Sequence, residues 1–309
     1  MDPVDAIDLE GDSTFVLMLE CQARGHRVLY AHPNALEQMG HRVCATVRPI
    51  RLQRTPGDHF ELGEAETVAL DDMDAVFMRK DPPFDEHFLI YTWLLDRVDT
   101  RRTVMVNDPQ AIRDFNEKLA ALRWPELMPK TLIAADRERL RAFIEAEGKV
   151  VVKPLLNAGG SGIILLEAGD RNIGSVLDLL TLEGRAMIEA QVYVPGVTDG
   201  DKRIILLNGQ PIGAVNRVPA ANDIRANMHV GGRAERIGLT ARDKEICDAV
   251  GPELARRGLI LTGIDVIAGH LTEVNVTSPT GLQEINRFDG VKLEAEIIDW
   301  VEARRAELG

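Results

Sequence analysis

Residues 259–276 read Leu-Ile-Leu-Thr-Gly-Ile-Asp-Val-Ile-Ala-Gly-His-Leu-Thr-Glu-Val-Asn-Val, two apolar runs around a short turn. Such a pattern predicts two strands joined as a hairpin. Glu273 and Asn275 are two residues apart, so they share one strand face, and Asp265 on the first strand can meet them across the hairpin. Carboxylate and amide oxygens are ligands that Mg²⁺ prefers. The pattern therefore favours a metal site over the alternative, a solvated polar face of an edge hairpin.

A second candidate site lies upstream, where an apolar strand over residues 149–154 precedes a glycine-rich turn at 157–162. A further strand over 163–166 makes this unit a hairpin, and the turn has neither the GxGxxG nor the Walker A pattern. Glycines alone favour a flexible hairpin tip. Lys153, however, ends the apolar strand and needs an anionic partner, and clustered glycines expose backbone N–H groups to phosphate oxygens. The combination indicates a phosphate clamp.

Arginines and a polar, glycine-ended segment form a third group. Arg203 follows the acidic turn at 199–202, Arg217 ends a predicted strand, and residues from about 218 to 233 have the composition of a mobile lid. Isolated arginines are usually surface residues. As a set beside a magnesium–phosphate site, they would offset charge that builds up during phosphoryl transfer.

The rest of the chain alternates predicted strands and helices in its first third, which favours an α/β class with a largely parallel sheet. Residues 33–72 are mixed and polar and are not assigned. Asn208-Gly209 between two apolar runs is the strongest short hairpin signal. Predicted helices lie near 12–25, 88–98, 136–147, 242–257 and from 291 onward, and predicted strands at 27–31, 74–78, 103–106, 203–207 and 211–215.

The composition limits the class of protein. The 309 residues suggest about two domains at roughly 150 residues each. A net charge of -13 argues against a general nucleic-acid binder, which needs a basic face. No apolar run approaches the roughly 18 residues of a membrane helix, and the start lacks a signal-peptide pattern. Three scattered cysteines give no disulfide framework. The expected protein is cytoplasmic, with no nucleic-acid or membrane partner.

Several motifs together carry a resemblance that covers essentially the whole chain. The chain resembles the bacterial glutathione synthetases of the ATP-grasp superfamily. The runs at 78–85 and 275–281 are highly specific, whereas the hairpin at 259–276 alone would indicate only ATP-grasp. The matching segments are Met1-Asp2-Pro3, Asp12-Ser13-Thr14-Phe15, Met78-Arg79-Lys80-Asp81-Pro82-Pro83-Phe84-Asp85, Asn116-Glu117-Lys118-Leu119, Asp199-Gly200-Asp201-Lys202-Arg203 and Thr272-Glu273-Val274-Asn275-Val276-Thr277-Ser278-Pro279-Thr280-Gly281.

The resemblance implies an ATP-grasp fold behind an N-terminal parallel-sheet domain. Residues 1–118 would form that domain, 119–193 the central lobe, and 194–309 the C-terminal lobe with the metal site and lid. Members of the family carry a strand before Met-Asp-Pro, so the first strand of the N-terminal sheet is expected to be missing here and its edge unpaired. The segment near Ala220-Ala221 lacks an expected glycine pair, which would stiffen the lid.

The implied activity is the ATP-dependent ligation of glycine to γ-glutamylcysteine, through an acyl phosphate, in a homotetramer. Two rivals remain: another ATP-grasp carboxylate–amine ligase, and a non-catalytic nucleotide-binding module. By resemblance, ATP is held by Lys118, Lys153, Gly159, Gly160 and Asp201, and by a strand edge that meets adenine, formed by Gln191, Val192, Tyr193 and Val194. Two Mg²⁺, or Mn²⁺, are held by Asp265, Glu273 and Asn275, and the acyl phosphate is stabilised by Arg203 and Arg217. The candidate substrate residues are Arg79, Lys80, Arg225, Ser278 and Thr280.

Overall fold

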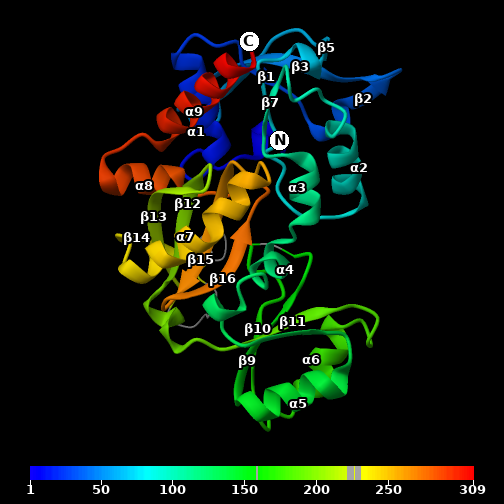
Figure 1. The fold of residues 1–309 in the computed structure, drawn as a ribbon, viewed down its shortest axis with the longest axis vertical. Coiled ribbons are helices and arrows are strands. Elements are labelled where there is room, and N and C mark those ends of the chain that lie inside the picture. Colours follow the sequence, from blue (N-terminus) through cyan, green and yellow to red (C-terminus); the bar gives the residue numbers. More distant parts are fainter. Residues whose placement is uncertain (158, 221–225, 227–230) are drawn as a thin grey trace.

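The computed structural model describes residues 1–157, 159–220, 226 and 231–309. Figure 1 shows an elongated molecule with its β-sheets arranged along the long axis; the described residues form four sheets. None of the described helices has the length and apolar character needed to cross a membrane.

The N-terminal part begins with α1 (Ser13–Ala23), whose first turn is capped by Asp12 Oδ1, which accepts a hydrogen bond from Phe15 N at 2.7 Å. The unassigned residues 33–72 prove to be an antiparallel sheet, in which the long strand β3 pairs with four others. Its strands are β1 (Leu29–Tyr30), β2 (Leu36–Met39), β3 (Arg42–Leu52), β4 (Phe60–Leu62) and β5 (Glu66–Ala69).

Parallel pairing is confirmed for one pair, β6 (Ala75–Phe77) and β7 (Val104–Val106). The largely parallel sheet expected from the alternation of elements is limited to this pair, because 33–72 folds back on itself through short hairpins. Among the described residues, β6 has no strand partner on its other edge. The helices of this part are α2 (Glu86–Leu95), α3 (Pro109–Asp114) and α4 (Glu117–Ala121).

The central sheet has the order β10-β9-β11-β8 and is antiparallel throughout. The predicted hairpin around the glycine turn is confirmed by the pairing of β10 with β9. The predicted helix after Asp136 is confirmed as well; Asp136 caps it, and Gly148 ends it at φ 83°. The elements are β8 (Thr131–Ala134), α5 (Arg137–Glu147), β9 (Lys149–Pro154), β10 (Ile164–Glu167), α6 (Ile173–Leu180) and β11 (Ile188–Val192).

The C-terminal sheet has the order β14-β13-β12-β15-β16 and is also antiparallel. The predicted Asn208-Gly209 turn joins β12 to β13, with φ values of 48° and 79°. The elements are β12 (Asp201–Leu207), β13 (Gln210–Val218), β14 (Arg233–Arg236), α7 (Ala241–Arg256), β15 (Leu261–Ile267), β16 (His270–Asn275), α8 (Leu282–Asp289) and α9 (Leu293–Leu308); short 3-10 helices lie at Val4–Ala6, Pro33–Ala35, Leu70–Asp72, Pro125–Leu127 and Pro195–Asp199.

The buried apolar side chains form three clusters that are distributed differently along the molecule. Two hydrophobic clusters are each built from N-terminal and C-terminal residues together, whereas a third is confined to the central sheet and its helices α5 and α6. The C-terminal helix α9 returns to pack beside α1 (Figure 1), where Arg24 forms ion pairs with Asp299 and Glu302. The central lobe thus has a core of its own beside a larger, continuous body.

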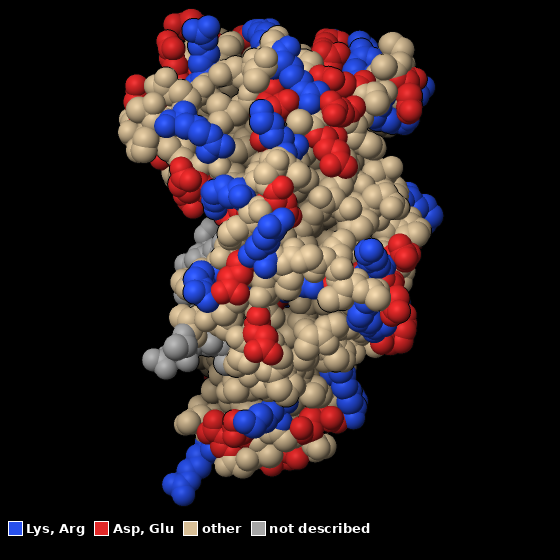
Figure 2. Space-filling view, turned by 90° about the vertical axis from the view of Figure 1, so that its left-hand side faces the viewer, with Lys and Arg blue, Asp and Glu red and all other residues tan. Residues whose placement is uncertain are grey.

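Charged side chains of both signs are interspersed over the face seen in Figure 2, at both ends of the molecule. The net charge of -13 is therefore not gathered into one acidic field on this face. A locally basic binding site is compatible with such a surface.

Candidate functional site

The hairpin β15–β16 brings together the three residues of the predicted metal site. Asp265 lies opposite Glu273 in the strand register, and Asn275 Nδ2 donates a hydrogen bond to Asp265 Oδ2 at 3.2 Å. The turn between the strands places Ala268 and Gly269 at φ 46° and 77°, which allows a two-residue connection. The predicted convergence of these side chains is therefore present.

Asp265 is buried and is the acceptor for two guanidinium groups. Arg203 donates from Nε at 2.5 Å and from Nη2 at 3.0 Å, and Arg217 Nη2 lies 2.9 Å from Oδ2. Burial by itself would raise the pKa of Asp265, but the two guanidinium groups outweigh it and hold that pKa well below its usual range. Asp265 is consequently a fixed negative charge at the base of the site.

Asp201 at the start of β12 shares Arg217 with Asp265. Its Oδ2 accepts a hydrogen bond from Arg217 Nη2 at 2.5 Å. Burial raises the pKa of Asp201 to about 6, although Arg217 opposes that shift. This carboxyl group is therefore the more easily protonated of the two.

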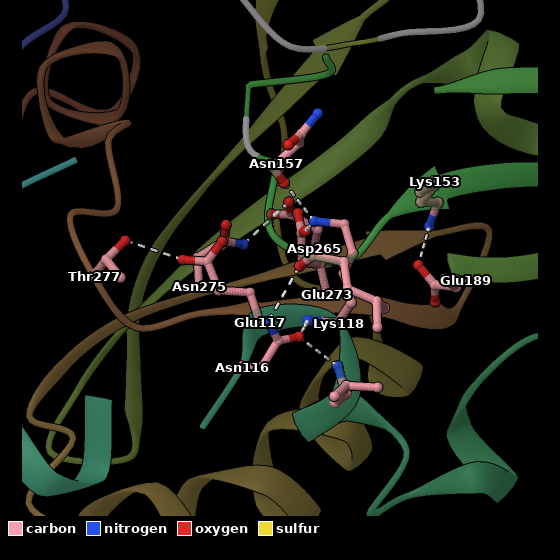
Figure 3. Close-up of polar contacts among 12 residues, drawn as sticks. Asn116, Glu117, Lys118, Lys153, Asn157, Glu189, Asp265, Glu273, Asn275 and Thr277 are labelled. Carbon is pink, nitrogen blue, oxygen red and sulfur yellow. Dashed lines mark hydrogen bonds and ion pairs between the residues drawn. The ribbon is translucent and has the colours of Figure 1, made fainter. Parts of the chain in front are cut away.

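Lys118 connects three parts of the site from the short helix α4. Asn116 caps this helix by accepting hydrogen bonds from the backbone N–H groups of Lys118 and Leu119. The buried Nζ of Lys118 lies 3.0 Å from Glu273 Oε1 and donates to the carbonyl oxygen of Asn157 at 2.8 Å (Figure 3). Burial alone would lower the pKa of Lys118, but the neighbouring carboxylates, Glu273 above all, raise it. Lys118 is thus a firmly held cation between the acidic hairpin and the glycine turn.

Lys153 projects from β9 toward the neighbouring strand β11. Its Nζ donates to Gln191 Oε1 at 3.0 Å and lies 3.3 Å from Glu189 Oε2 (Figure 3). These contacts follow from the strand register, in which Glu189 is directly opposite Lys153. The second predicted phosphate-binding lysine is therefore also fixed by its neighbours.

One cavity unites most of the predicted residues between the central sheet and the hairpin β15–β16. The space within it, counting the part open to solvent, is about 880 Å³. Two lysines and three carboxylates face a wall with apolar members. It is lined by Lys118, Val151, Lys153, Asn157, Gly159, Gly160, Ser161, Ile163, Gln191, Val192, Tyr193, Val194, Val197, Asp201, Ala226, Asp265, Ile267, Thr272 and Glu273.

The residues expected at adenine, Gln191–Val194, all line the cavity, but the strand that carries them is not at the edge of its sheet. β11 is paired with β9 on one side and β8 on the other. The expectation of a strand edge is therefore corrected: only the residues after the strand, Tyr193 and Val194, leave the sheet.

The predicted arginines and substrate residues lie outside the cavity lining given by the described residues. Arg203 and Arg217 are buried behind Asp265. Arg79 is buried and donates to Thr14 Oγ1 at 3.0 Å and to the carbonyl oxygen of Pro279 at 2.9 Å, which places it against the loop that holds Ser278 and Thr280. Thr280 O accepts a long hydrogen bond, 3.4 Å, from Arg203.

Lys80 is separate from this group. It pairs with Asp2 at 2.7 Å and lines a second cavity beside α2. Arg225 lies outside the described residues, as does most of the expected lid, including Ala221. Ala226 is described; it is buried and lines the main cavity.

Two buried or half-buried carboxylates were not predicted. Glu117 accepts a hydrogen bond from Thr277 Oγ1 at 3.0 Å, and burial, reinforced by Glu273, raises its pKa to about 7. A glutamate in the first turn of a helix is common for dipole reasons, so its sequence position gave no signal. Glu189 is fully buried and pairs with Lys153. A charged residue between Ile188 and Ala190, two positions before Gln191, was a usable signal.

The donor set can be examined for a divalent cation. Within the described part of the chain, no three histidine, cysteine, aspartate or glutamate side chains gather as a metal-binding group. The hairpin supplies two carboxylates and one amide instead, all oxygen donors, and Asp265 and Glu273 line the cavity. Hard cations such as Mg²⁺ use this chemistry and complete their shell with water and phosphate oxygens. The residues present fit such an ion.

Comparison with known proteins places this geometry in a family. Residues 1–113 match the N-terminal domain of prokaryotic glutathione synthetase, and residues 117–290 match its ATP-grasp domain. The glutathione synthetase of Bradyrhizobium diazoefficiens is 46% identical over 307 residues, covering 99% of this chain and 98% of that protein. That of Nostoc sp. is 43% identical over 311 residues, covering 98% and 96%.

Solved structures resemble the fold at low sequence identity. The ATP-grasp ligase PsnB, complexed with a minimal precursor, superposes with a TM-score of 0.63 at 19% identity, covering 94% of each chain. The D-cycloserine synthetase DcsG gives 0.58 at 17% identity, covering 77% of this chain and 86% of that one. These likenesses show an ATP-grasp fold. With both family domains matched and full-length relatives above 40% identity, the chain belongs to the prokaryotic glutathione synthetase family.

Proposed function

We propose that this protein is an ATP-dependent ligase that joins glycine to γ-glutamylcysteine and releases glutathione, ADP and phosphate. The observation that carries the proposal is the single cavity lined by Lys118, Lys153, Asp265 and Glu273 in a chain of this family. ATP's γ-phosphoryl group passes to the cysteinyl carboxylate and forms an acyl phosphate. The glycine amine attacks the acyl carbon, and phosphate leaves as the amide bond forms.

The cavity walls support a division of roles toward ATP. Lys118 and Lys153, with the backbone N–H groups of Gly159 and Gly160, would hold the phosphates, because two fixed cations beside a glycine turn match a polyphosphate. The segment 191–194 would meet adenine, and Asp201 would lie near the nucleotide. Phosphoryl transfer depends on positioning and charge neutralisation, so the site needs no nucleophilic side chain.

Asp265, Glu273 and Asn275 would hold Mg²⁺, with Mn²⁺ as a substitute. The ion, when bound, would supply positive charge to the phosphate oxygens. The chain's own contribution is to keep the donors in place: the guanidinium groups behind Asp265 hold it ionised, and Lys118 holds Glu273 at 3.0 Å.

The remaining assignments rest on the resemblance to the family. Arg203 and Arg217 would stabilise the acyl phosphate by their charge, and Arg79, Ser278 and Thr280 would bind the dipeptide from one loop cluster. Lys80 and Arg225 stay as substrate candidates. The lid over 218–233 would keep water from hydrolysing the acyl phosphate.

At the level of the whole molecule, we propose three units, residues 1–118, 119–193 and 194–309, with the first boundary falling in α4. The separate core of the central sheet supports the second unit. We further propose a cytoplasmic homotetramer, for which size-exclusion chromatography with light scattering gives the direct measurement.

A coupled assay of ADP release tests the reaction. We expect turnover with MgATP only when both γ-glutamylcysteine and glycine are present, with glutathione identified by mass spectrometry. ADP release with a different acid–amine pair, and none with these two, would identify another ATP-grasp ligase. Tight ATP binding without ADP release with any such pair would identify a non-catalytic module.

A further inference from the structure

Glu189 is a carboxylate in the interior of the central sheet. It lies on β11, paired with Lys153 on β9 and with Ile133 on β8, and its side chain is 0% exposed. Ionised carboxylates are rarely buried in this way without a compensating charge. Glu189 at this position therefore needs a neighbouring positive charge or hydrogen-bond donors.

The partner is the ammonium group of Lys153. Glu189 Oε2 lies 3.3 Å from Lys153 Nζ, and no described residue donates a hydrogen bond to this oxygen. Glu189 Oε1 accepts from Gln191 Nε2 at 3.3 Å, and the same nitrogen donates to Thr131 Oγ1 at 3.1 Å. Glu189 and Gln191, two residues apart on β11, both contact Lys153; Figure 3 shows the pair formed by Glu189 and Lys153.

The geometry divides the donors of Lys153 between two directions. The ammonium group of Lys153 donates one hydrogen bond, to Gln191 Oε1, and lies at ion-pair distance from Glu189 Oε2. Lys153 and Gln191 line the cavity, whereas Glu189 is not among the described residues that line it. An ammonium group has three N–H donors, so Lys153 keeps donors for a ligand in the cavity, while Glu189 contacts it from outside the cavity lining.

The charges agree with this arrangement. Burial raises the pKa of Glu189, and Lys153 opposes the shift. Lys153, in turn, has 13% of its side chain exposed, and Glu189 is its ion-pair partner. Without that partner, the flexible lysine side chain would be free to turn away from this position.

We propose that Glu189 is a positioning residue that fixes the ammonium group of Lys153 in the cavity wall, so that affinity for the polyphosphate of ATP depends on it. The inference rests on the proposed function, in which Lys153 holds ATP phosphates. Glu189 itself touches no part of the nucleotide in this arrangement. Its effect must therefore pass through Lys153 and be confined to the phosphates.

The test compares dissociation constants for MgATP, without dipeptide or glycine, and for adenosine, which lacks the phosphates. Glu189→Met keeps the length and apolar packing but removes the charge, and we expect about tenfold weaker MgATP binding, because Lys153 then lacks the ion-pair partner that orients it. Adenosine binding, measured by competition with a fluorescent nucleotide, should be unchanged. Glu189→Gln, which retains an acceptor, should weaken MgATP less than Glu189→Met does.

A double-mutant cycle shows whether the effect passes through Lys153. Adding Glu189→Met to Lys153→Met should cause no further loss of MgATP affinity, because the interaction is already absent. Glu167→Met is the matched control: Glu167 also lies opposite a lysine on β9, Lys149, but both side chains are more than half exposed and lie outside the described cavity lining. This control should leave both dissociation constants unchanged.

Several results would overturn the proposal. If both Glu189 variants bind MgATP as tightly as the wild type does, the carboxylate only fills space. If they bind MgATP more tightly, the carboxylate only repels phosphate. An equal loss for adenosine, or an undiminished loss in the Lys153→Met background, would show a general effect on the sheet. If Lys153→Met alone left MgATP binding intact, the phosphate role of Lys153 would fail first, and the Glu189 proposal with it.

Discussion

Replacing Asp265 by asparagine removes a buried negative charge that is paired with two arginines. The carboxylate accepts two hydrogen bonds from Arg203 and lies 2.9 Å from Arg217 Nη2. Asparagine keeps the shape but replaces one oxygen by an N–H₂ group. That group would face N–H donors of the guanidinium groups, so at least one good contact becomes a donor–donor clash.

The expected loss of stability follows from burial. The side chains of Asp265, Arg203 and Arg217 are 4%, 7% and 6% exposed, so solvent cannot replace the lost partner. Removing one member of a buried ion pair typically costs about 3–5 kcal/mol. Arg217 retains Asp201 as a partner, which places the expected loss near the lower end, about 3 kcal/mol.

Urea unfolding followed by circular dichroism measures this loss, together with the thermal midpoint, which should fall by roughly 5 °C or more. Asp72→Asn is the matched control, because Asp72 also accepts from two arginines, Arg42 and Arg102, but is 48% exposed. Exposed ion pairs contribute about 0–1 kcal/mol. The control should therefore unfold close to the wild type.

The reasoning fails if Asp265→Asn unfolds within experimental error of Asp72→Asn. Such a result would mean that water or a rearranged partner compensates the two arginines, and that Asp265 is kept for cation binding alone. A loss of activity without a loss of stability would carry the same meaning.

Three further predictions concern other parts of the molecule. Glu273→Ala should abolish ADP release while circular dichroism shows an intact fold, because Glu273 is partly exposed and lines the cavity; retained turnover would remove its metal role. The pKa of Glu117 in the folded state, about 7, lies above the ordinary 4.5. Its contribution to the free energy of unfolding is therefore fully present below pH 4.5 and is lost as the pH rises to 7. Glu117→Gln should flatten that decline, by on the order of 1–3 kcal/mol, and an unchanged pH profile of unfolding would contradict it. Gly209→Ala should destabilise the fold by at least about 1 kcal/mol, because a Cβ there would overlap the carbonyl group of Gly251; wild-type stability in urea would refute the close approach.

Local signals were enough to predict most helices and hairpins. Asp136 and Gly148 bound α5 as their side chain and backbone preferences require, and Asn208-Gly209 forms the predicted turn. These features depend on residues within a few positions of one another. They could therefore be predicted without any knowledge of the rest of the fold.

Pairing between distant or weakly patterned strands could not be predicted in the same way. Within residues 33–72, β3 alternates buried with more exposed side chains over most of its length, a usable strand signal, but the antiparallel sheet exists because β3 pairs with four short strands. The alternation of strands and helices predicted a largely parallel sheet, but only β6 and β7 pair in parallel in the described structure. Strand order depends on tertiary contacts, which composition and spacing do not encode.

In the candidate site, too, some features could be predicted from local spacing and others could not. The face shared by Glu273 and Asn275, and the lysine before the glycine turn, followed from spacing alone. The pairing of Lys118 with Glu273, 155 positions later in the chain, did not. Neither did the burial that raises the pKa of Glu117, nor the position of Arg203 and Arg217 behind Asp265.

By itself, the sequence determined the family, the residue types of the site and the local elements that carry them, because motifs and caps act over short distances. The tertiary structure alone decided which of those residues meet in one cavity, which arginines are committed to Asp265, and that Glu189 stands behind Lys153. The physical reason is that charge pairing and desolvation are set by three-dimensional neighbours, and these come from strands far apart in the chain.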